Sequence, residues 1–226
     1  MPPPGACKLA PMHRLTALVL FLLALTPATL GGTVILTPDA GYLATTSLVT
    51  FSDPDEALLS SVTAGPLNIT FSNLFRASTV GNNWATWAAP PDTESATPRV
   101  LWSGLDDNTF FPITTSTLDF SLNVSLFGFE LQPGPTDQHT VTASFFNGVT
   151  LLQSVSRDLL GDSGARLFAY SAGPGESITS VVIHSDADWA SGQLRFQEAE
   201  PVPEPASAAL TAAALSLLYL HFRKRK

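Results

Sequence analysis

Three carboxylate side chains stand together at Asp53, Asp55 and Glu56, and Pro54 between them indicates a turn. Calcium takes hard oxygen ligands such as these carboxylates. The segment lacks the ligand spacing of a defined calcium loop, so a solvated turn is the alternative interpretation. Calcium is therefore the one cofactor that these residues suggest, and a domain without a cofactor is the main expectation.

A second group of candidate metal ligands is spaced by two residues, at His184, Asp186 and Asp188. On an extended strand these side chains share one face, which could hold a metal ion. Val181 and Ile183 indicate that the other face of the same strand is the buried one. We therefore expect the three polar residues to lie on a solvated strand end, with metal binding as the alternative.

Tryptophans and acidic residues gather between residues 84 and 107. They are Trp84, Trp87 and Trp102, with Asp92, Glu94, Asp106 and Asp107. Aromatic rings stack on the apolar faces of sugars, and carboxylates accept hydrogen bonds from sugar hydroxyl groups. The pattern suggests a sugar-binding face, and plain packing of the tryptophans is the alternative. A paired-acid glycosidase would need two acids at a fixed separation, which the sequence does not specify.

One tetrapeptide, Gly161-Asp162-Ser163-Gly164, resembles the nucleophile loop of trypsin-like proteases. Ala165-Arg166 stands where those proteases have Gly-Pro, and His139 is the only histidine before it in the body of the chain. A catalytic triad needs a base within hydrogen-bond reach of the serine and an acid that orients the base. We interpret the tetrapeptide as a polar turn.

The body of the chain is strongly acidic. Residues 29 to 200 contain five arginine and eighteen acidic side chains, a net charge of −13 with histidine counted as neutral. Such a surface repels phosphate backbones, so we expect no nucleic-acid partner. The only cysteine, Cys7, lies in the N-terminal segment, so we expect no disulfide in the body.

Short apolar alternations, separated by clusters of Gly, Pro, Asn and Asp, predict an all-β body from residue 33 to 196. The clearest run has alternating apolar residues at Leu118, Phe120, Leu122, Val124 and Leu126. These side chains should point to one face, the core. The alternation changes phase at Phe127-Gly128-Phe129, which predicts a bulge or bend near Gly128.

Other runs predict further strands. They include Leu67, Ile69 and Phe71; Val141, Ala143 and Phe145; Val181 and Ile183; and Leu194 and Phe196. Asn147-Gly148 predicts a tight hairpin turn into a strand over residues 149–155. Many short strands and no long amphipathic helix favour a single two-sheet β-sandwich of the jelly-roll type. Residues 197–201 are interpreted as a linker.

The N-terminus has the pattern of an export signal. Lys8 and Arg14 precede an apolar run from Leu15 to Leu25, and small residues follow at Thr26 and Ala28. A run of this length is too short to span a bilayer but suits the core of a signal peptide. We predict cleavage by signal peptidase after Ala28, with Met12 as an alternative start of the chain.

The C-terminus has three parts in a fixed order: Pro203-Glu204-Pro205, an apolar stretch over residues 206–222, and the cations Arg223, Lys224, Arg225 and Lys226. The apolar stretch predicts a transmembrane helix of marginal length. The terminal cations should stay on the cytoplasmic side and stop transfer, which leaves the body outside.

These three parts resemble the PEP-CTERM sorting signal of bacterial surface proteins. In that family the Pro-Glu-Pro motif, the helix and the basic end direct the protein to an exosortase, a membrane-bound cysteine protease that is thought to cut near the motif. The resemblance covers the last 24 residues and assigns the sorting motif to Pro203, Glu204 and Pro205. An ordinary single-pass anchor is the alternative.

Parts of the body are similar to domains found in many PEP-CTERM proteins. The similar segments are 84–87 with Pro90-Pro91, 100–102, 127–131 and 165–169. This resemblance implies an exported β-sandwich protein that is associated with exopolysaccharide and biofilm. In a Gram-negative bacterium, such a protein would first be anchored in the inner membrane and would then reach the cell surface or the medium.

The sequence thus predicts a signal peptide (1–28), an extracellular β-sandwich domain (29–198), and a linker with a PEP-CTERM tail (199–226). We expect a non-enzymatic surface or matrix protein, with exosortase and signal peptidase as processing enzymes and exopolysaccharide as a possible partner. The first alternative is a carbohydrate-binding module, and the second is a glycoside-active enzyme.

Overall fold

The computed structural model describes residues 31–104 and 112–200. The predicted signal peptide, sorting motif, transmembrane helix and terminal cations lie outside these residues. The described chain forms β1 (Thr33–Ile35), α2 (Ala40–Thr45), β2 (Ser47–Leu48), β3 (Leu58–Ala64), β4 (Leu67–Thr79), β5 (Arg99–Trp102), β6 (Thr115–Pro133), β7 (Gln138–Asn147), β8 (Thr150–Leu160), β9 (Arg166–Ser171), β10 (Ile178–Ser185) and β11 (Trp189–Glu198). The expected all-β fold is confirmed.

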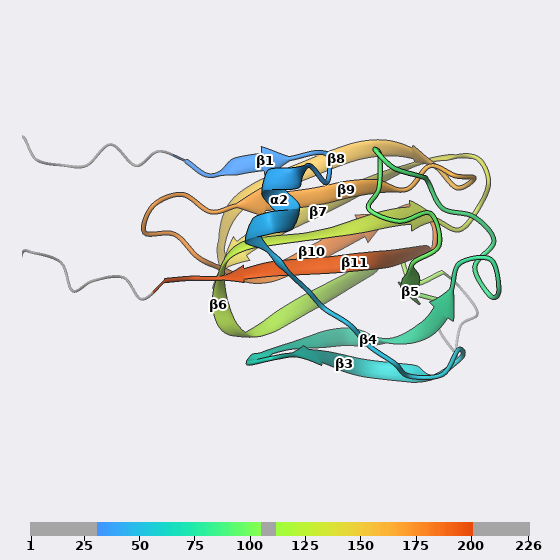
Figure 1. The fold of residues 1–226 in the computed structure, drawn as a ribbon, viewed down its shortest axis with the longest axis horizontal. Helices are drawn as coiled ribbons and strands as arrows, with labels where there is room; N and C mark the ends of the chain where they lie inside the picture. The colour runs from blue at the N-terminus through green and yellow to red at the C-terminus, as the bar shows by residue number, and fades with distance from the viewer. Residues whose placement is uncertain (1–30, 105–111, 201–226) are drawn as a thin grey trace, which may run out of the picture. The chain divides into compact units, whose positions relative to one another are not determined.

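Two antiparallel sheets share the long strand β6 (Figure 1). Its first half, residues 115–124, pairs with β10 on one side and β4 on the other, and β7 and β8 continue this sheet beyond β10. We call it sheet I. Its second half, residues 126–133, pairs with β9 and β11, and β1, β2 and β5 extend this sheet, which we call sheet II. The end of β4, residues 76–79, pairs with β5, so β4 also joins the two sheets, and β3 pairs with β4. The two sheets enclose one core, as a β-sandwich requires.

The core contains the apolar residues that alternate along the strands. Val141, Ala143 and Phe145 of β7 and Val181 and Ile183 of β10 are fully buried, as their spacing predicts. Across the core, the ring of Phe145 in sheet I lies 5.6 Å from the ring of Tyr170 in sheet II, measured between centroids. The predicted hairpin is also present, since β7 ends at Asn147 and pairs with β8 across a tight turn.

The two halves of β6 differ in burial. In the first half, apolar residues face the core and polar residues face solvent, so the strand shows the expected alternation. In the second half, every residue from Leu126 to Pro133 is buried. Phe127, Phe129 and Leu131 point into the core, and the side chains between them point to the outer face of sheet II. That outer face must therefore be covered by other parts of the chain.

Helix α2 covers one end of this outer face (Figure 1). Tyr42 of α2 packs with Leu126 of β6 and with Leu167 and Ala169 of β9. Asp39 caps the helix by accepting a hydrogen bond from the Tyr42 amide at 2.8 Å. This six-residue helix was not predicted from the sequence, although Asp39, directly before it, is a typical N-cap residue.

The pairing of β6 with β11 does contain a bulge near Gly128, as predicted, but the extra residue is on β11 and not on β6. This bulge lies between residues 192 and 195 of β11. The pairing of β6 with β9 runs regularly through Gly128. The register of β6 itself shifts at Ser125, in its pairing with β11, and between Asp119 and Val124, in its pairing with β10.

The phase change at Phe127 instead marks the change from one buried face to two. Leu126 is buried on the outer face under α2 rather than with Phe120 in the core, so the expectation for Leu126 was wrong. Gly128 is needed because α2 comes close to the strand there. A Cβ atom on Gly128 would lie 2.5 Å from the Tyr42 hydroxyl oxygen.

Strand β11 continues through Glu198, the last residue of the predicted sandwich domain. Gln197 and Glu198 were also interpreted as the start of a linker over residues 197–201, and they belong to the sandwich instead. Among residues 31–104 and 112–200, no helix has the length and apolar character needed to cross a bilayer.

Replacing Gly128 by valine should lower the free energy of unfolding by about 1–3 kcal/mol, because the new side chain would overlap Tyr42 and Ala169. Urea denaturation of the purified protein would measure this. The control is G31V, because a Cβ atom on Gly31 would have no neighbour within 4 Å, and it should change stability by less than about 0.5 kcal/mol. Equal stability of G128V and wild type would contradict the close approach of α2.

Candidate functional site

The loop between β4 and β5, residues 80–98, covers the rest of the outer face of sheet II. We call it the cover loop. Its Trp84 and Trp87 are only 8% and 5% exposed, and they pack with Val100 of β5 and Ala190 of β11. Loops usually run over the surface with polar side chains. This one is instead built around an apolar cluster of its own.

Glu130 is the buried acid beneath the cover loop. Its side chain points from β6 to the outer face and is 1% exposed. Its Oε2 accepts a hydrogen bond from Trp87 Nε1 at 2.9 Å, and its Oε1 accepts one from the Glu94 amide. Both donors belong to the cover loop, so the carboxylate fastens the loop to the sheet.

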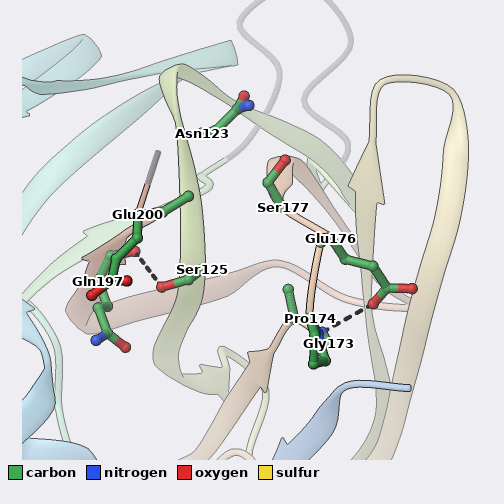
Figure 2. A pocket seen from close by; sticks show the side chains of 11 residues that line it. Asn123, Ser125, Gly173, Pro174, Glu176, Ser177, Gln197 and Glu200 are labelled. Atoms are coloured by element: carbon green, nitrogen blue, oxygen red, sulfur yellow. Dashed lines mark hydrogen bonds between the residues drawn. The ribbon is translucent and has the colours of Figure 1, made fainter. Parts of the chain in front are cut away.

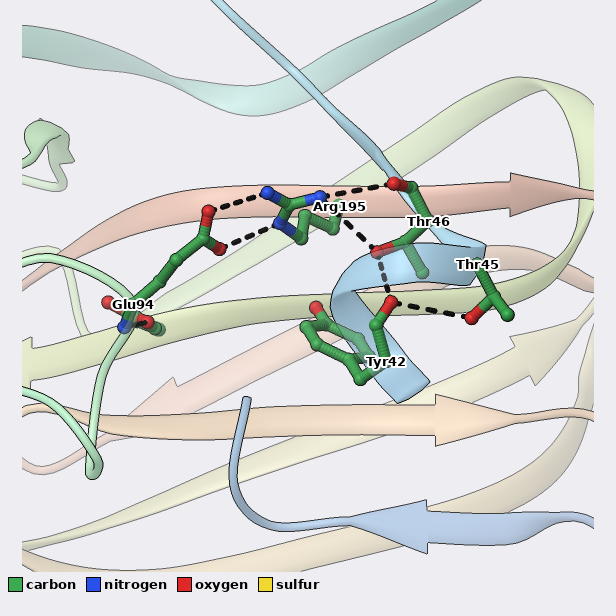
Figure 3. A network of polar contacts seen from close by, with 6 residues as sticks. Tyr42, Thr45, Thr46, Glu94 and Arg195 are labelled. Atoms are coloured by element: carbon green, nitrogen blue, oxygen red, sulfur yellow. Dashed lines mark hydrogen bonds and ion pairs between the residues drawn. The ribbon is translucent and has the colours of Figure 1, made fainter. Parts of the chain in front are cut away.

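A second acid of the cover loop, Glu94, pairs with Arg195 of β11 (Figure 3). The two guanidinium nitrogens Nε and Nη2 each donate to one oxygen of the Glu94 carboxylate, which makes the pair bidentate. Arg195 also donates to the carbonyl of Thr46 at 3.0 Å, just after α2. One cation therefore joins the cover loop, the sheet and the helix.

Burial dominates the electrostatics of this region. It raises the pKa of Glu130 to about 7, although the two N–H donors favour the charged form. Burial likewise raises the pKa of the Tyr42 hydroxyl above its ordinary range. The network holds the cover in place.

A hollow of about 320 Å³ lies beside this network, where β6 ends. Three segments form it: the cover loop at residues 83–86, the end of β6 with the loop that follows it, and the turn after β8. Its lining includes Trp84, Ala85, Thr86, Gln132, Gly161 and Asp162. This hollow combines a tryptophan with one buried polar side chain, that of Gln132.

The predicted sugar-binding tryptophans are brought into one region but not onto one open face. The rings of Trp84 and Trp102 lie 6.3 Å apart, and Trp102 Nε1 donates to Asp188 at 2.7 Å. Because Trp84 and Trp87 are buried, neither can offer a whole free ring for stacking. Of the three, only Trp84 lines the 320 Å³ hollow. Asp106 and Asp107 lie outside the described residues.

Two acids of the predicted calcium turn, Asp55 and Glu56, accept hydrogen bonds from neighbouring side chains. Asp55 accepts hydrogen bonds from Thr79 Oγ1 at 2.8 Å and from Asn82 Nδ2 at 2.7 Å. Glu56 accepts from Arg76 and Asn83, and the carbonyl of Asp53 accepts from Arg99. These hydrogen bonds lower the pKa of both Asp55 and Glu56, so both stay charged at neutral pH.

His184, Asp186 and Asp188 do not converge. His184 contacts Thr115, Asp186 contacts His139, and Asp188 contacts Trp102. Among the residues that the structure describes, no three histidine, cysteine or acidic side chains are arranged to hold a metal ion.

His139 instead lies between two carboxylates. Its Nδ1 is 2.9 Å from Asp186 Oδ1, and its Nε2 is 2.8 Å from Asp137 Oδ1. Burial alone would lower the pKa of His139, but the two hydrogen bonds outweigh that effect and raise it. The pair of acids therefore favours a charged imidazolium that ties the start of β7 to the end of β10.

The Gly161–Gly164 tetrapeptide forms a turn after β8, as expected. Ser163 Oγ contacts its neighbour Asp162 at 3.1 Å, and the Ser163 amide donates to Thr86 Oγ1. His139 contacts Asp137 and Asp186 and has no hydrogen bond to Ser163. The turn thus serves to join the end of β8 to the cover loop.

A larger hollow, of about 660 Å³, lies where β11 leaves the domain (Figure 2). Two of its polar side chains are used within the protein: Ser125 Oγ donates to the Glu198 carbonyl, and Glu176 accepts from the Gly173 amide, both at 3.0 Å. It also lies next to residues that the structure does not describe. We therefore regard it as a feature of the tail exit and not as the candidate site.

Comparison with protein-family models and with curated proteins finds no match. Among solved structures, the enzymatically active domain of bacteriophage CBA120 tailspike protein 4 is a distant match, with 11% identity and a TM-score of 0.29 over 58% of this chain and 19% of that chain. CsCBM6-3 from Clostridium stercorarium in complex with cellobiose matches with 12% identity and a TM-score of 0.28 over 54% of this chain and 87% of that chain. The Clostridium thermocellum xylanase 10B CBM22-1–GH10 modules complexed with xylohexaose match with 9% identity and a TM-score of 0.32 over 68% of this chain and 28% of that chain.

These likenesses are weak. The chain spans less than a third of the tailspike and xylanase chains it matches, and every TM-score is at or below 0.32. The assignment of a β-sandwich therefore rests on the strand pairing of this chain itself, and no functional conclusion is drawn from the matches.

The raised pKa of Glu130 predicts a pH-dependent stability. Between about pH 4.5 and 7 the folded protein keeps a proton on Glu130 that the unfolded chain releases, so stability should fall as the pH rises. The contribution is up to about 3 kcal/mol. Urea unfolding at several pH values should show a flatter profile for E130Q than for wild type. Parallel profiles would show that Glu130 does not titrate in this range.

Proposed function

We propose that this chain is an exported, non-catalytic protein of the bacterial surface or extracellular matrix. In this proposal the sandwich is the delivered part, and the C-terminal tail is a PEP-CTERM sorting signal that an exosortase recognises. The observation that carries the proposal is the order of Pro203-Glu204-Pro205, an apolar stretch and four terminal cations directly after a folded β domain.

The end of the sandwich supports this division of roles. Strand β11 lies inside sheet II between β6 and the short strands β2 and β5, and the Ala199 amide still donates to the Asn123 carbonyl. Only residues 200–202 separate this hydrogen bond from Pro203. A cut near the motif would therefore leave every strand of the sandwich intact.

The motif itself suits a protease cleft. Its two prolines disfavour helix and keep the segment extended just before the apolar stretch begins. The apolar stretch would hold the substrate in the bilayer, and the cations would stop it from being pulled through. Export also agrees with the acidic, cysteine-free body, which suits a soluble domain in an oxidising compartment. Association with exopolysaccharide belongs to the same proposal.

Replacing Pro203, Glu204 and Pro205 by alanine should leave the protein inserted in the membrane but uncut. In a host that has an exosortase, mass spectrometry and membrane fractionation would follow the mature form. A matched variant with the four terminal cations changed to serine should instead leak to the medium, because the stop signal is weakened. Normal maturation of the alanine variant would show that the tail is only an anchor.

A further inference from the structure

The tip of the β7–β8 hairpin is apolar where such turns are usually polar. Asn147 pairs with Thr150, so Gly148 and Val149 form a two-residue loop, and Gly148 has a φ of +56°. Loops of this kind with glycine first usually have Asn, Asp or Ser second. Val149 is instead 99% exposed, and Leu151 beside it is 53% exposed. Neither belongs to a core cluster of the described residues, so the pair indicates a contact outside the domain.

This tip lies at the end of the sandwich from which the C-terminal tail leaves, which we call the tail-exit end. Glu198 of β11 pairs with Val124 of β6, and Val124 pairs in turn with Ile178 of β10. The Gly148 amide donates to Thr179 Oγ1, on the next residue of β10, at 2.7 Å. Neighbouring strands are ~4.8 Å apart, so the path across the sheet from the end of β11 to the tip is about 14 Å. Strand β1 begins at the same end (Figure 1).

The tail would keep this end close to the bilayer. In the proposed function residues 206–222 span the membrane, and Ala199 is still hydrogen-bonded to Asn123 of the sandwich. Only residues 200–205 lie between the two. Six extended residues reach ~20 Å at most, and the headgroup region of a bilayer is roughly 5–8 Å thick on each side. The tail-exit end therefore stays at or near the headgroups for as long as the tail is uncut.

The turns of the tail-exit end carry little charge. They are Gly65-Pro66, Gly148-Val149 and residues 172–177. Glu176 is their only ionisable side chain, and it accepts a hydrogen bond from the Gly173 amide. Glu198 and Glu200 stand where the tail itself leaves.

The opposite end differs. Its turns over residues 134–137, 161–165 and 186–188 contain four aspartates, namely Asp137, Asp162, Asp186 and Asp188. Charged side chains are costly to remove from water, so a lipid surface suits the tail-exit end better.

A weak contact is enough here because the tail already holds the domain at the bilayer. Val149 and Leu151 offer the apolar surface of fewer than two side chains, which is too little to keep a free protein on a membrane. A second attachment within one molecule acts at a high effective concentration, so its own affinity can be low. Once the chain is cut near Pro203, this contact alone would not retain the domain.

We propose that the Gly148-Val149 tip enters the headgroup region of the lipid bilayer while the tail is uncut, and that it fixes the orientation of the sandwich on the membrane. Val149 and Leu151 contact lipid, and the four aspartates at the opposite end point away from the bilayer. This orientation holds Pro203-Glu204-Pro205 at the membrane surface, where an exosortase acts. The inference rests on the proposed function in one respect, since it needs the apolar stretch to span the bilayer.

Site-specific fluorescence in vesicles would test the contact. The full chain with C7S, which removes its only cysteine, would be prepared from a host without an exosortase and placed in vesicles of phosphatidylethanolamine and phosphatidylglycerol. An NBD label on T150C, an exposed position next to the tip, should emit at shorter wavelength and be quenched by doxyl-labelled phospholipid. The same label on D162C, which is exposed ~30 Å or more away beyond the far end of β8, should show neither effect.

The V149D change in the T150C background adds a charge at the tip and should abolish both effects, because a charged side chain resists transfer out of water. S154D is the matched control, since it places the same charge at an exposed position of the same strand away from the tip, and it should keep both effects. Val149 is 99% exposed, so V149D should fold as wild type does, which thermal unfolding would check.

Quenching that is absent from T150C while the chain floats with the vesicles would show that the tip does not touch lipid, and the proposal would be wrong. Retained quenching in V149D would also contradict it. Shielding from aqueous iodide without doxyl quenching would indicate a second copy of the chain at the tip instead of the bilayer. A chain that does not float with the vesicles would overturn both this inference and the tail as a membrane segment. Normal maturation of the alanine variant at Pro203-Glu204-Pro205 would contradict sorting alone and leave the contact standing.

Discussion

Burial of the second half of β6 on both faces is the constraint from which the other features of sheet II follow. One face packs into the core through Phe127, Phe129 and Leu131. The other face would expose Leu126 and a row of backbone unless something covered it. Helix α2 and the cover loop meet that need, and their apolar residues join the sheet there. The loop between β4 and β5 is therefore part of the fold.

A cover over polar side chains must also satisfy them. Glu130 lies beneath the cover, and an unpaired carboxylate there would be costly. Trp87 Nε1 and the Glu94 amide satisfy it, and Arg195 in turn neutralises Glu94. Gln132 is satisfied only in part: its Nε2 donates hydrogen bonds, but its Oε1 accepts none among the described residues.

The alternation of apolar and polar residues was enough to predict the strands of sheet I. One face of this sheet is exposed to solvent, so every second residue is apolar in Leu118–Val124 and Val141–Phe145. The pattern fails in the second half of β6, because burial on both faces removes the alternation. The bulge near Gly128 was therefore predicted on β6, although it belongs to β11. The polar network was not predictable, since Glu94 and Arg195 are 101 residues apart. The tryptophans were correctly singled out as a cluster, but sequence alone could not distinguish a buried ring from an exposed one.

Hydrogen exchange at the Glu94 amide tests the central claim most directly, because this amide belongs to the cover loop and donates to Glu130 of β6. Native-state exchange in increasing denaturant compares its opening free energy with that of amides within β6. If the cover is part of the fold, the Glu94 amide should exchange only through the same opening that exposes β6. Exchange of the Glu94 amide through a low-energy local opening, with β6 still protected, would contradict the account.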